Sequence, residues 1–172
     1  MKSDDNLYLV GPMGVGKTTI GKLLAKRLKK QFVDLDDEIE ARAGASIPWI
    51  FDVEGESGFR RRETELLAEF SRRRGMVVST GGGVVTREEN RRLLKGAGVV
   101  VYLNASPEQL HARTLKDKKR PLLQVPDRLK VITELKEARD PFYREVADIV
   151  FDVGSRNSRQ ATEILCKKLE HL

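Results

Sequence analysis

The chain has 172 residues, of which 40% are hydrophobic and 34% are charged, which suits a single compact domain over residues 1–172 and leaves little room for a second. No apolar run approaches the roughly 20 residues that span a bilayer, and no leader sequence opens the chain, so we expect a cytoplasmic protein without a membrane partner. The net charge of +6 is compatible with a nucleic-acid partner. However, aromatic residues make up only 6% of the chain, and none interleaves with the arginine triplets at 60–62 and 72–74. This composition favours an enzyme for anionic substrates instead.

A glycine-rich segment follows the first predicted strand, residues 7–10, and leads into a predicted helix over about 18–30. The pattern G-x-x-x-x-G-K-[ST] is met by Gly11, Gly16, Lys17 and Thr18. In such a loop, backbone N–H groups cradle phosphates, the lysine reaches the β- and γ-phosphates, and the hydroxyl is placed to ligate Mg²⁺. We therefore expect a nucleoside triphosphate to contact six residues: Gly14, Val15, Gly16, Lys17, Thr18 and Thr19. The alternative, a glycine-rich turn that binds nothing, does not account for the strand and helix on either side.

Two aspartates lie in the second predicted strand, residues 32–36. Side chains alternate along a strand, so Asp34 and Asp36 are expected side by side on one face. A short helix over 37–43 is predicted to follow. Trp49, which comes after it, is expected to be an ordinary packing residue.

The third predicted strand, residues 76–79, is almost wholly apolar and follows a helix that begins near Phe59. It runs straight into three consecutive glycines at 81–83. One interpretation is a flexible turn; the other is that glycines at the carboxyl end of a strand let a ligand approach the backbone closely. A helix over 87–95 and a fourth strand over 99–103 are predicted next.

The segment at 116–126 is basic, contains prolines and shows no period that would bury one face, so we predict a mobile loop. The helix after it is expected to reach about Arg139 and to be interrupted at Asp140-Pro141, before a fifth strand over 149–153. Strand and helix alternate throughout, and crossovers of this length impose parallel pairing. The prediction is a doubly wound α/β fold, with a five-stranded parallel sheet, helices on both faces and ligands at the carboxyl ends of the strands.

Five groups of residues carry a family resemblance in their order and spacing. They are the phosphate loop at 11–18, Asp34-Leu35-Asp36, Gly58-Phe59-Arg60, the glycines at 81–83, and the later arginines within 119–123 and 138–143. Together they resemble the shikimate kinase family of P-loop enzymes, which has the nucleoside monophosphate kinase-like fold, over essentially the whole chain. The resemblance implies that ATP phosphorylates the 3-hydroxyl of shikimate, a step toward chorismate and the aromatic amino acids.

The resemblance also implies which residues bind the phosphoryl acceptor. Shikimate carries one carboxylate and three ring hydroxyls, so a site for it needs cationic forks and hydrogen-bond acceptors. Arg60 and Arg139 resemble the arginines that bind the carboxylate in this family, whereas a surface salt bridge is the alternative for each. Asp36 resembles the residue that accepts from the hydroxyls and is the best candidate base. The backbone N–H groups of Gly81 and Gly82 complete the expected site.

For the metal, Thr18 is the expected direct ligand of Mg²⁺, and Asp34 resembles the residue that organises the ion through bound water. The end of the third strand lacks an unambiguous acidic residue there, although many P-loop enzymes carry one. The acceptor-binding segment is expected over about 34–62.

The predicted loop at about 116–126 resembles the lid that closes over ATP, and Arg120 within it is expected to stabilise charge in the transition state. Arg156 resembles a residue of the segment over the adenine and is expected to contact ATP. The expected catalytic residues are Lys17, Asp36 and Arg120.

Alternatives stay open within the same fold and outside it. Another small-molecule kinase, such as a gluconate kinase, would share the phosphate loop and the lid, so the acceptor pocket decides between them. A regulatory P-loop switch protein would need a guanine-specific element such as N-K-x-D, which the sequence lacks. A nucleic-acid-binding module is the third alternative. We expect a monomer whose partners are shikimate and ATP.

Overall fold

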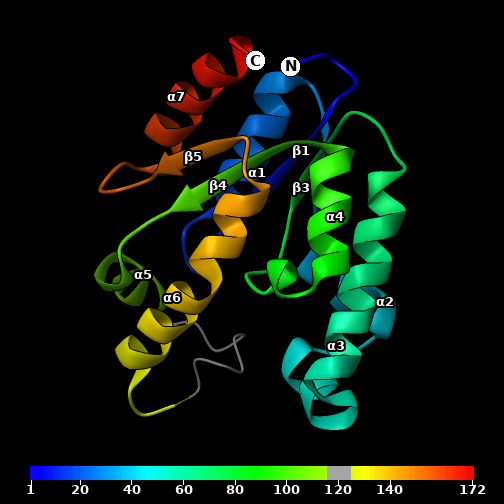
Figure 1. Ribbon diagram of the computed structural model, residues 1–172, viewed down its shortest axis with the longest axis vertical. Helices are drawn as coiled ribbons and strands as arrows, with labels where there is room; N and C mark the ends of the chain where they lie inside the picture. Colours follow the sequence, from blue (N-terminus) through cyan, green and yellow to red (C-terminus); the bar gives the residue numbers. More distant parts are fainter. Residues whose placement is uncertain (116–124) are drawn as a thin grey trace.

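A single parallel sheet lies at the centre of the computed structural model, which describes residues 1–115 and 125–172 (Figure 1). The strands are β1 Asn6–Val10, β2 Gln31–Asp34, β3 Met76–Ser79, β4 Gly98–Asn104 and β5 Ile149–Asp152. Their order in the sheet is β2-β3-β1-β4-β5, and every neighbouring pair is parallel. Leu9 lies opposite Ser79 on one side and Val101 on the other, so the carboxyl ends of these strands meet at one edge. The predicted doubly wound α/β fold is confirmed.

Helices cover both faces of the sheet (Figure 1). They are α1 Lys17–Leu28, α2 Leu35–Ala43, α3 Ile47–Ser71, α4 Glu88–Ala97, α5 Pro107–Thr114, α6 Arg128–Val146 and α7 Ser158–Glu170, with a short 3₁₀ turn at Val84–Thr86. In the part of the chain that the structure describes, none of them is long and apolar enough to cross a membrane.

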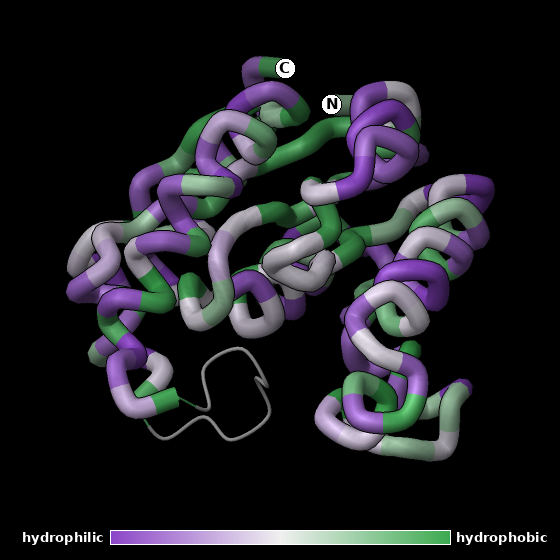
Figure 2. The backbone as a smooth tube through the Cα atoms, turned by 60° about the horizontal axis from the view of Figure 1, so that its bottom comes forward, coloured by the Kyte–Doolittle hydropathy of each residue, from purple (hydrophilic) through white to green (hydrophobic). Residues whose placement is uncertain are grey.

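The two faces of the sheet are built by alternation along the strands. Leu7 and Leu9 of β1 belong to one hydrophobic cluster with residues of α1 and α7, whereas Tyr8 and Val10 belong to a second cluster with residues of α3 and α4. All four side chains are fully buried. Figure 2 shows the hydrophobic colouring gathered along the central strands, while the surrounding helices alternate between hydrophilic and hydrophobic residues. Burial on both faces explains the apolar runs that predicted these strands.

The second strand ends earlier than the sequence predicts. β2 stops at Asp34, and Asp36 lies in the first turn of α2. The reason is that the Asp34 carboxylate caps this helix: its Oδ1 accepts from the Asp37 N–H at 3.1 Å, which turns the chain out of the strand. The prediction that Asp34 and Asp36 share a strand face is therefore wrong.

The helix α6 is longer than predicted, because it continues through Pro141 to Val146. Proline removes one N–H from the helical ladder, but Tyr143 and Val146 beyond it are buried in the core and hold the last turns in place. Asp140 adds to this by accepting from the Tyr102 hydroxyl at 2.6 Å. The predicted interruption at Asp140-Pro141 is wrong.

The helix α3 contains one non-helical residue, Gly55, with φ 72° and ψ 178°. The helix predicted to begin near Phe59 is the part after this kink. Trp49, in the part before it, is 60% exposed, so the prediction that it is a packing residue is wrong. Phe51 occupies the inner side instead, with its ring centroid 5.0 Å from that of Phe59.

Candidate active site

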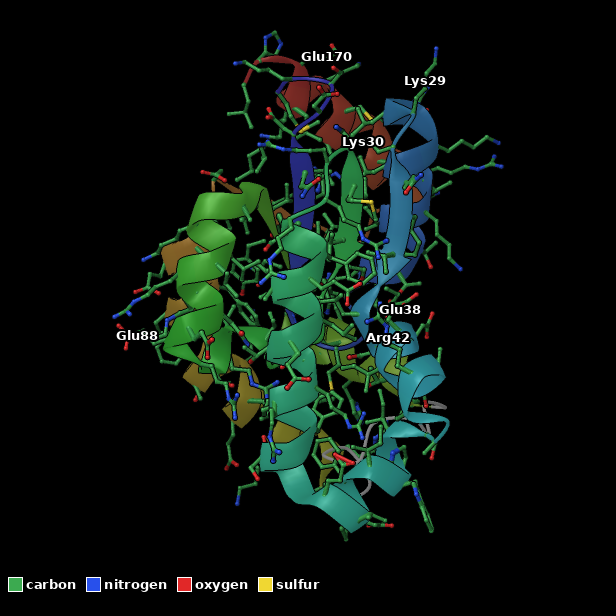
Figure 3. The ribbon with its side chains drawn as sticks, turned by 90° about the vertical axis from the view of Figure 1, so that its right-hand side faces the viewer. Lys29, Lys30, Glu38, Arg42, Glu88 and Glu170 are labelled. Carbon is green, nitrogen blue, oxygen red and sulfur yellow. The ribbon has the colours of Figure 1, made fainter. Side chains whose placement is uncertain are left out.

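Buried charge marks one region of the molecule. Most charged side chains project into solvent, as Glu88 at the start of α4 and Lys29 at the end of α1 do in Figure 3. Within residues 1–115 and 125–172, only four charged residues are classed as buried: Lys17, Arg60, Glu63 and Arg139. All four lie at the carboxyl edge of the sheet or on the helices beside it. Ionised groups leave water only where a specific environment compensates them, so this edge is the candidate site.

The phosphate loop wraps around its own lysine. Gly14 and Gly16 have φ values of +80° and +102°, a conformation that side-chain-bearing residues rarely adopt. The loop delivers Lys17 to the start of α1, where its Nζ donates to the carbonyls of Gly11 at 2.7 Å and Pro12 at 3.0 Å. The first turn of α1 contains no acidic residue. The helix N-terminus and the ammonium group thus present positive potential at the same place, which suits an anion such as a phosphate.

Three side chains that carry oxygen atoms lie next to this loop. The Thr18 hydroxyl donates to Oδ2 of Asp34 at 2.6 Å, and Asp34 lies opposite Ser79 in the sheet. Hydroxyl and carboxylate oxygens are the ligands that Mg²⁺ prefers. Thr18, Asp34 and Ser79 therefore form a patch whose chemistry suits that ion.

A cavity of about 200 Å³ joins these features. Its lining residues are Met13, Gly14, Gly16, Lys17, Thr18, Thr19, Asp34, Asp36, Ser79, Thr80, Gly81 and Gly82. Five of the six phosphate-loop residues predicted to contact the nucleotide are among them. Val15 is fully buried in the core instead, and its carbonyl accepts from Arg113 of α5 at 3.2 Å. The same cavity holds both predicted aspartates, so the kink after β2 does not separate them.

The three consecutive glycines let charged side chains approach the backbone. A Cβ atom at Gly81 would lie 2.7 Å from Glu63 Oε2 and 2.9 Å from Asp36 Oδ1, and one at Gly83 would lie 2.2 Å from Arg60 Nη2. At Gly82 the nearest charged neighbour is Arg139 Nη1, at 3.5 Å. Side chains from α2, α3 and α6 therefore converge on one segment, because that segment has no side chains of its own. The packing explains this run by the close approach of side chains to its backbone, and the approach of a ligand stays a prediction.

Arg60 is held by two acids of its own helix. Its Nη1 donates to Glu63 at 2.9 Å and its Nη2 to Glu56 at 3.3 Å. Burial lowers the pKa of Arg60, but the two carboxylates outweigh burial, so the net shift is upward and the guanidinium stays charged. Glu63 is fully buried, and the loss of water raises its pKa to about 7, with Arg60 acting in the opposite direction. Glu63 therefore titrates near neutral pH.

Arg139 has a different environment. It is only 6% exposed, yet no carboxylate of the described residues lies within 4.0 Å of it as an ion-pair partner. A buried guanidinium in this position offers its paired donors to a planar anion. Arg60 and Arg139 reach the glycine segment from α3 and α6, so the structure brings together the two arginines predicted to bind a carboxylate.

Besides Val15, four predicted residues are not among those that line this cavity: Arg60 and Arg139, which lie against the adjoining glycine segment, and Arg156 and Arg120. Arg156 lies after β5, where its Nη1 donates to the carbonyl of Asp152 at 3.0 Å, and it does not line the cavity. Arg120 and most of the predicted lid fall on residues 116–124, which lie outside the described ranges. Sequence reasoning missed Glu63 and Tyr143. The spacing of Glu63 three residues after Arg60 was the available signal for the first, since i and i+3 share a helix face.

Comparison with known proteins identifies the family. The family model for shikimate kinase matches residues 13–170. A shikimate kinase of Pseudomonas paraeruginosa is 53% identical over 167 residues, which cover 97% of each chain. The chain belongs to the shikimate kinase family. The resemblance inferred from its motifs is thereby confirmed, and the family consists of ATP-dependent kinases.

Comparison with solved structures distinguishes the shikimate kinase family from other kinases that have a similar fold. A shikimate kinase of Acinetobacter baumannii, solved in complex with shikimate, superposes with a TM-score of 0.94 at 48% identity, covering 98% of this chain and 95% of that one. A gluconokinase of Sinorhizobium meliloti has a TM-score of 0.57 at 15% identity, which is a likeness of fold alone. Membership of the shikimate kinase family therefore outweighs the sugar-acid kinase alternative.

The raised pKa of Glu63 predicts a pH dependence of stability. Between its ordinary value of 4.5 and about 7, the folded state binds a proton at Glu63 that the unfolded state has released, so the free energy of unfolding falls as pH rises through this window. Glu63→Gln removes this contribution. The free energy of unfolding of both proteins is measured with urea at each pH. The wild-type value minus the Glu63→Gln value is expected to fall by on the order of 2 kcal/mol from pH 4.5 to 7.5. Glu65→Gln, exposed on the same helix, serves as the control, and parallel curves for wild type and Glu63→Gln would contradict the expectation.

The close packing of Arg60 on Gly83 predicts an asymmetry between glycines. Gly83 has φ −95° and ψ 7°, which alanine tolerates, so Gly83→Ala acts only through the new methyl group against Arg60. Displacing this guanidinium from buried Glu63 is expected to lower stability by roughly 1–3 kcal/mol. Gly96→Ala in α4 meets nothing within 4 Å and is expected to be neutral or stabilising by up to about 1 kcal/mol. Thermal unfolding measures both, and a Gly83→Ala protein as stable as the wild type would refute the packing argument.

Proposed function

We propose that this protein transfers the γ-phosphoryl group of ATP to the 3-hydroxyl of shikimate, giving shikimate 3-phosphate and ADP. The observation that carries the proposal is the convergence, in a member of the shikimate kinase family, of a phosphate loop and two buried arginines on one glycine segment. The substrates have the matching chemistry. ATP supplies a polyanion for the loop, and shikimate supplies a single carboxylate with neighbouring hydroxyls.

At the ATP end, the loop N–H groups, the α1 dipole and Lys17 are proposed to bind the phosphates and to offset the charge that develops during transfer. We assign Mg²⁺ to Thr18 as a direct ligand and to Asp34 through water, because their oxygen atoms meet at the cavity wall. When bound, the ion would neutralise charge on the phosphate oxygens. The hydrogen bond between Thr18 and Asp34 holds both groups at this wall.

At the acceptor end, Arg60 and Arg139 are proposed to bind the shikimate carboxylate, with the N–H groups of Gly81 and Gly82 alongside. Arg60 already has two carboxylate partners, whereas Arg139 has none among the described residues, so Arg139 gains the larger share of new charge pairing. Asp36 lines the same cavity as Lys17 and lies against Gly81. This position between the two ends suits it to accept the proton that the 3-hydroxyl loses when it attacks the γ-phosphorus.

A coupled assay of ADP release tests the proposal directly. Shikimate, quinate, gluconate and nucleoside monophosphates are each offered with MgATP. Turnover is expected with shikimate at a kcat/KM far above that of the other acceptors. Turnover with gluconate in place of shikimate would return the sugar-acid kinase alternative to first place.

Arg139→Ala is expected to weaken shikimate binding by roughly 10- to 100-fold, since it removes charge-assisted bonds worth about 1.5–3 kcal/mol. Lysine at this position should restore little, because it lacks the planar fork. Arg60→Ala should weaken binding to a similar degree and also destabilise the fold, because it leaves Glu63 buried without its cation. Isothermal titration of shikimate measures the effect. Arg144→Ala, an exposed arginine on the same helix, is the control, and wild-type affinity in Arg139→Ala would remove this residue from the pocket.

Asp36→Asn is expected to lower kcat by roughly 10²-fold or more while changing shikimate affinity much less, because the amide keeps the shape but loses the charge that takes up the proton. Steady-state kinetics and titration separate the two quantities. Glu38→Gln, on the same helix (Figure 3), provides the comparison. An unchanged kcat in Asp36→Asn would exclude Asp36 as the base.

A further inference from the structure

We propose that Tyr143 is a positioning residue for the acceptor: its hydroxyl clamps the carbonyl of Gly82 and so fixes the glycine segment against α6. The inference rests on the proposed function, because it concerns how the acceptor end of that site is held in shape. Tyr143 falls within the segment 138–143 that carries part of the family resemblance, but the sequence assigns it no role, and it lies beyond Pro141 in the part of α6 that was not predicted to be helical.

The contact between Tyr143 and Gly82 is direct and buried. The Tyr143 side chain is fully buried, and its hydroxyl donates to the Gly82 carbonyl at 2.5 Å, across 61 positions of sequence. Burial raises the pKa of Tyr143 to about 12, although Arg139 acts in the opposite direction. The hydroxyl therefore keeps its proton at neutral pH and acts as a donor.

Each glycine carbonyl of the segment is held, but by different means. The Gly81 carbonyl accepts from the Val84 N–H at 3.2 Å, and the Gly83 carbonyl accepts from the Thr86 N–H at 3.1 Å, both within the local turn. The Gly82 carbonyl is held by Tyr143, a contact from another element. The C=O of one residue and the N–H of the next point in opposite directions across a trans peptide. Holding the carbonyls of Gly81 and Gly82 therefore also fixes the directions of the N–H groups of Gly82 and Gly83. Tyr143 thus fixes the peptide unit between Gly82 and Gly83, whose carbonyl is not bonded within the local turn.

The same face of α6 carries the predicted carboxylate ligand. Arg139 precedes Tyr143 by four residues, so the two side chains lie one above the other on the helix. Arg139 Nη1 would lie 3.5 Å from a Cβ atom at Gly82. Successive turns of α6 therefore contact Gly82 with a guanidinium and a hydroxyl. The clamp therefore fixes Gly82, whose own N–H is one of the proposed donors to the acceptor, beside Arg139.

A second tyrosine provides a matched control. The Tyr102 ring of β4 lies 4.9 Å from the Tyr143 ring and is also fully buried. Its hydroxyl donates to Asp140 at 2.6 Å and lies 3.1 Å from Asn104 Oδ1, and it does not contact the glycine segment. Replacing either tyrosine by phenylalanine removes one buried hydroxyl and keeps the ring packing, but only one of the two changes touches Gly82.

The experiment compares Tyr143→Phe with Tyr102→Phe. Tyr143→Phe is expected to raise the Kd and KM for shikimate roughly 5- to 30-fold, as for a buried carbonyl left without its donor, with the KM for MgATP within about two-fold of wild type. Tyr102→Phe is expected to leave shikimate affinity within about two-fold. Unchanged shikimate affinity in Tyr143→Phe, or an equal loss in both variants, would overturn the proposal.

Amide hydrogen exchange provides a measurement that needs no substrate. In the ligand-free protein, Tyr143→Phe should speed exchange at residues 81–84 several-fold while the amides of β1 and β4 exchange as in the wild type. Exchange at 81–84 that matches the wild type overturns the clamp. This readout also separates the two proposals: if the wild-type protein releases no ADP with shikimate, the proposed function fails, and the exchange result still decides whether Tyr143 holds the segment.

Discussion

Charged groups that leave water must find compensation inside the protein, and the architecture of this site follows from that requirement. Lys17 finds it in two loop carbonyls, and Arg60 finds it in Glu63 and Glu56. Arg139 is the exception, because no described carboxylate pairs with it. Under the proposed function, the substrate carboxylate would supply the ion pair that the described residues do not, so that binding the substrate would also compensate the charge of Arg139.

The parallel sheet explains how residues so far apart in sequence reach one cavity. In the order β2-β3-β1, three neighbouring strands end at one edge, and a part of the site lies at the end of each: Asp34 and Asp36 at the end of β2, the glycines after β3 and the phosphate loop after β1. The helices α3 and α6 lie beside this edge (Figure 1), and they carry Arg60 and Arg139. The topology thus delivers the loops, and the missing glycine side chains let the helices close on them.

Much of the fold and part of the site could be predicted from the sequence because the signals are local. The phosphate loop and the apolar strands each depend on residues within a few positions of one another. The burial of Glu63 does not: an acid on an amphipathic helix reads as solvated until the glycines some 20 positions later are known to pack against it.

Two further misreadings have the same origin. Proline at 141 predicts the end of a helix by local rules, and only the burial of Tyr143 and Val146 keeps the helix going. Asp36 has the spacing of a strand residue, and the capping of α2 by Asp34 moves it into a helix. In each case a tertiary contact or a side-chain hydrogen bond overrides the local pattern.

The two ends of the chain meet on the far side of the sheet from the cavity. β1 starts at the amino edge, and α7 runs back to that edge after β5, so that the Met1 amino group donates to the Leu169 carbonyl at 3.4 Å and both ends lie together at the top of Figure 1. Ends this close can be joined by a short linker, and the molecule is accordingly suited to circular permutation. A fusion partner or a surface tether attached at either end would likewise be joined at the edge of the sheet opposite the phosphate loop.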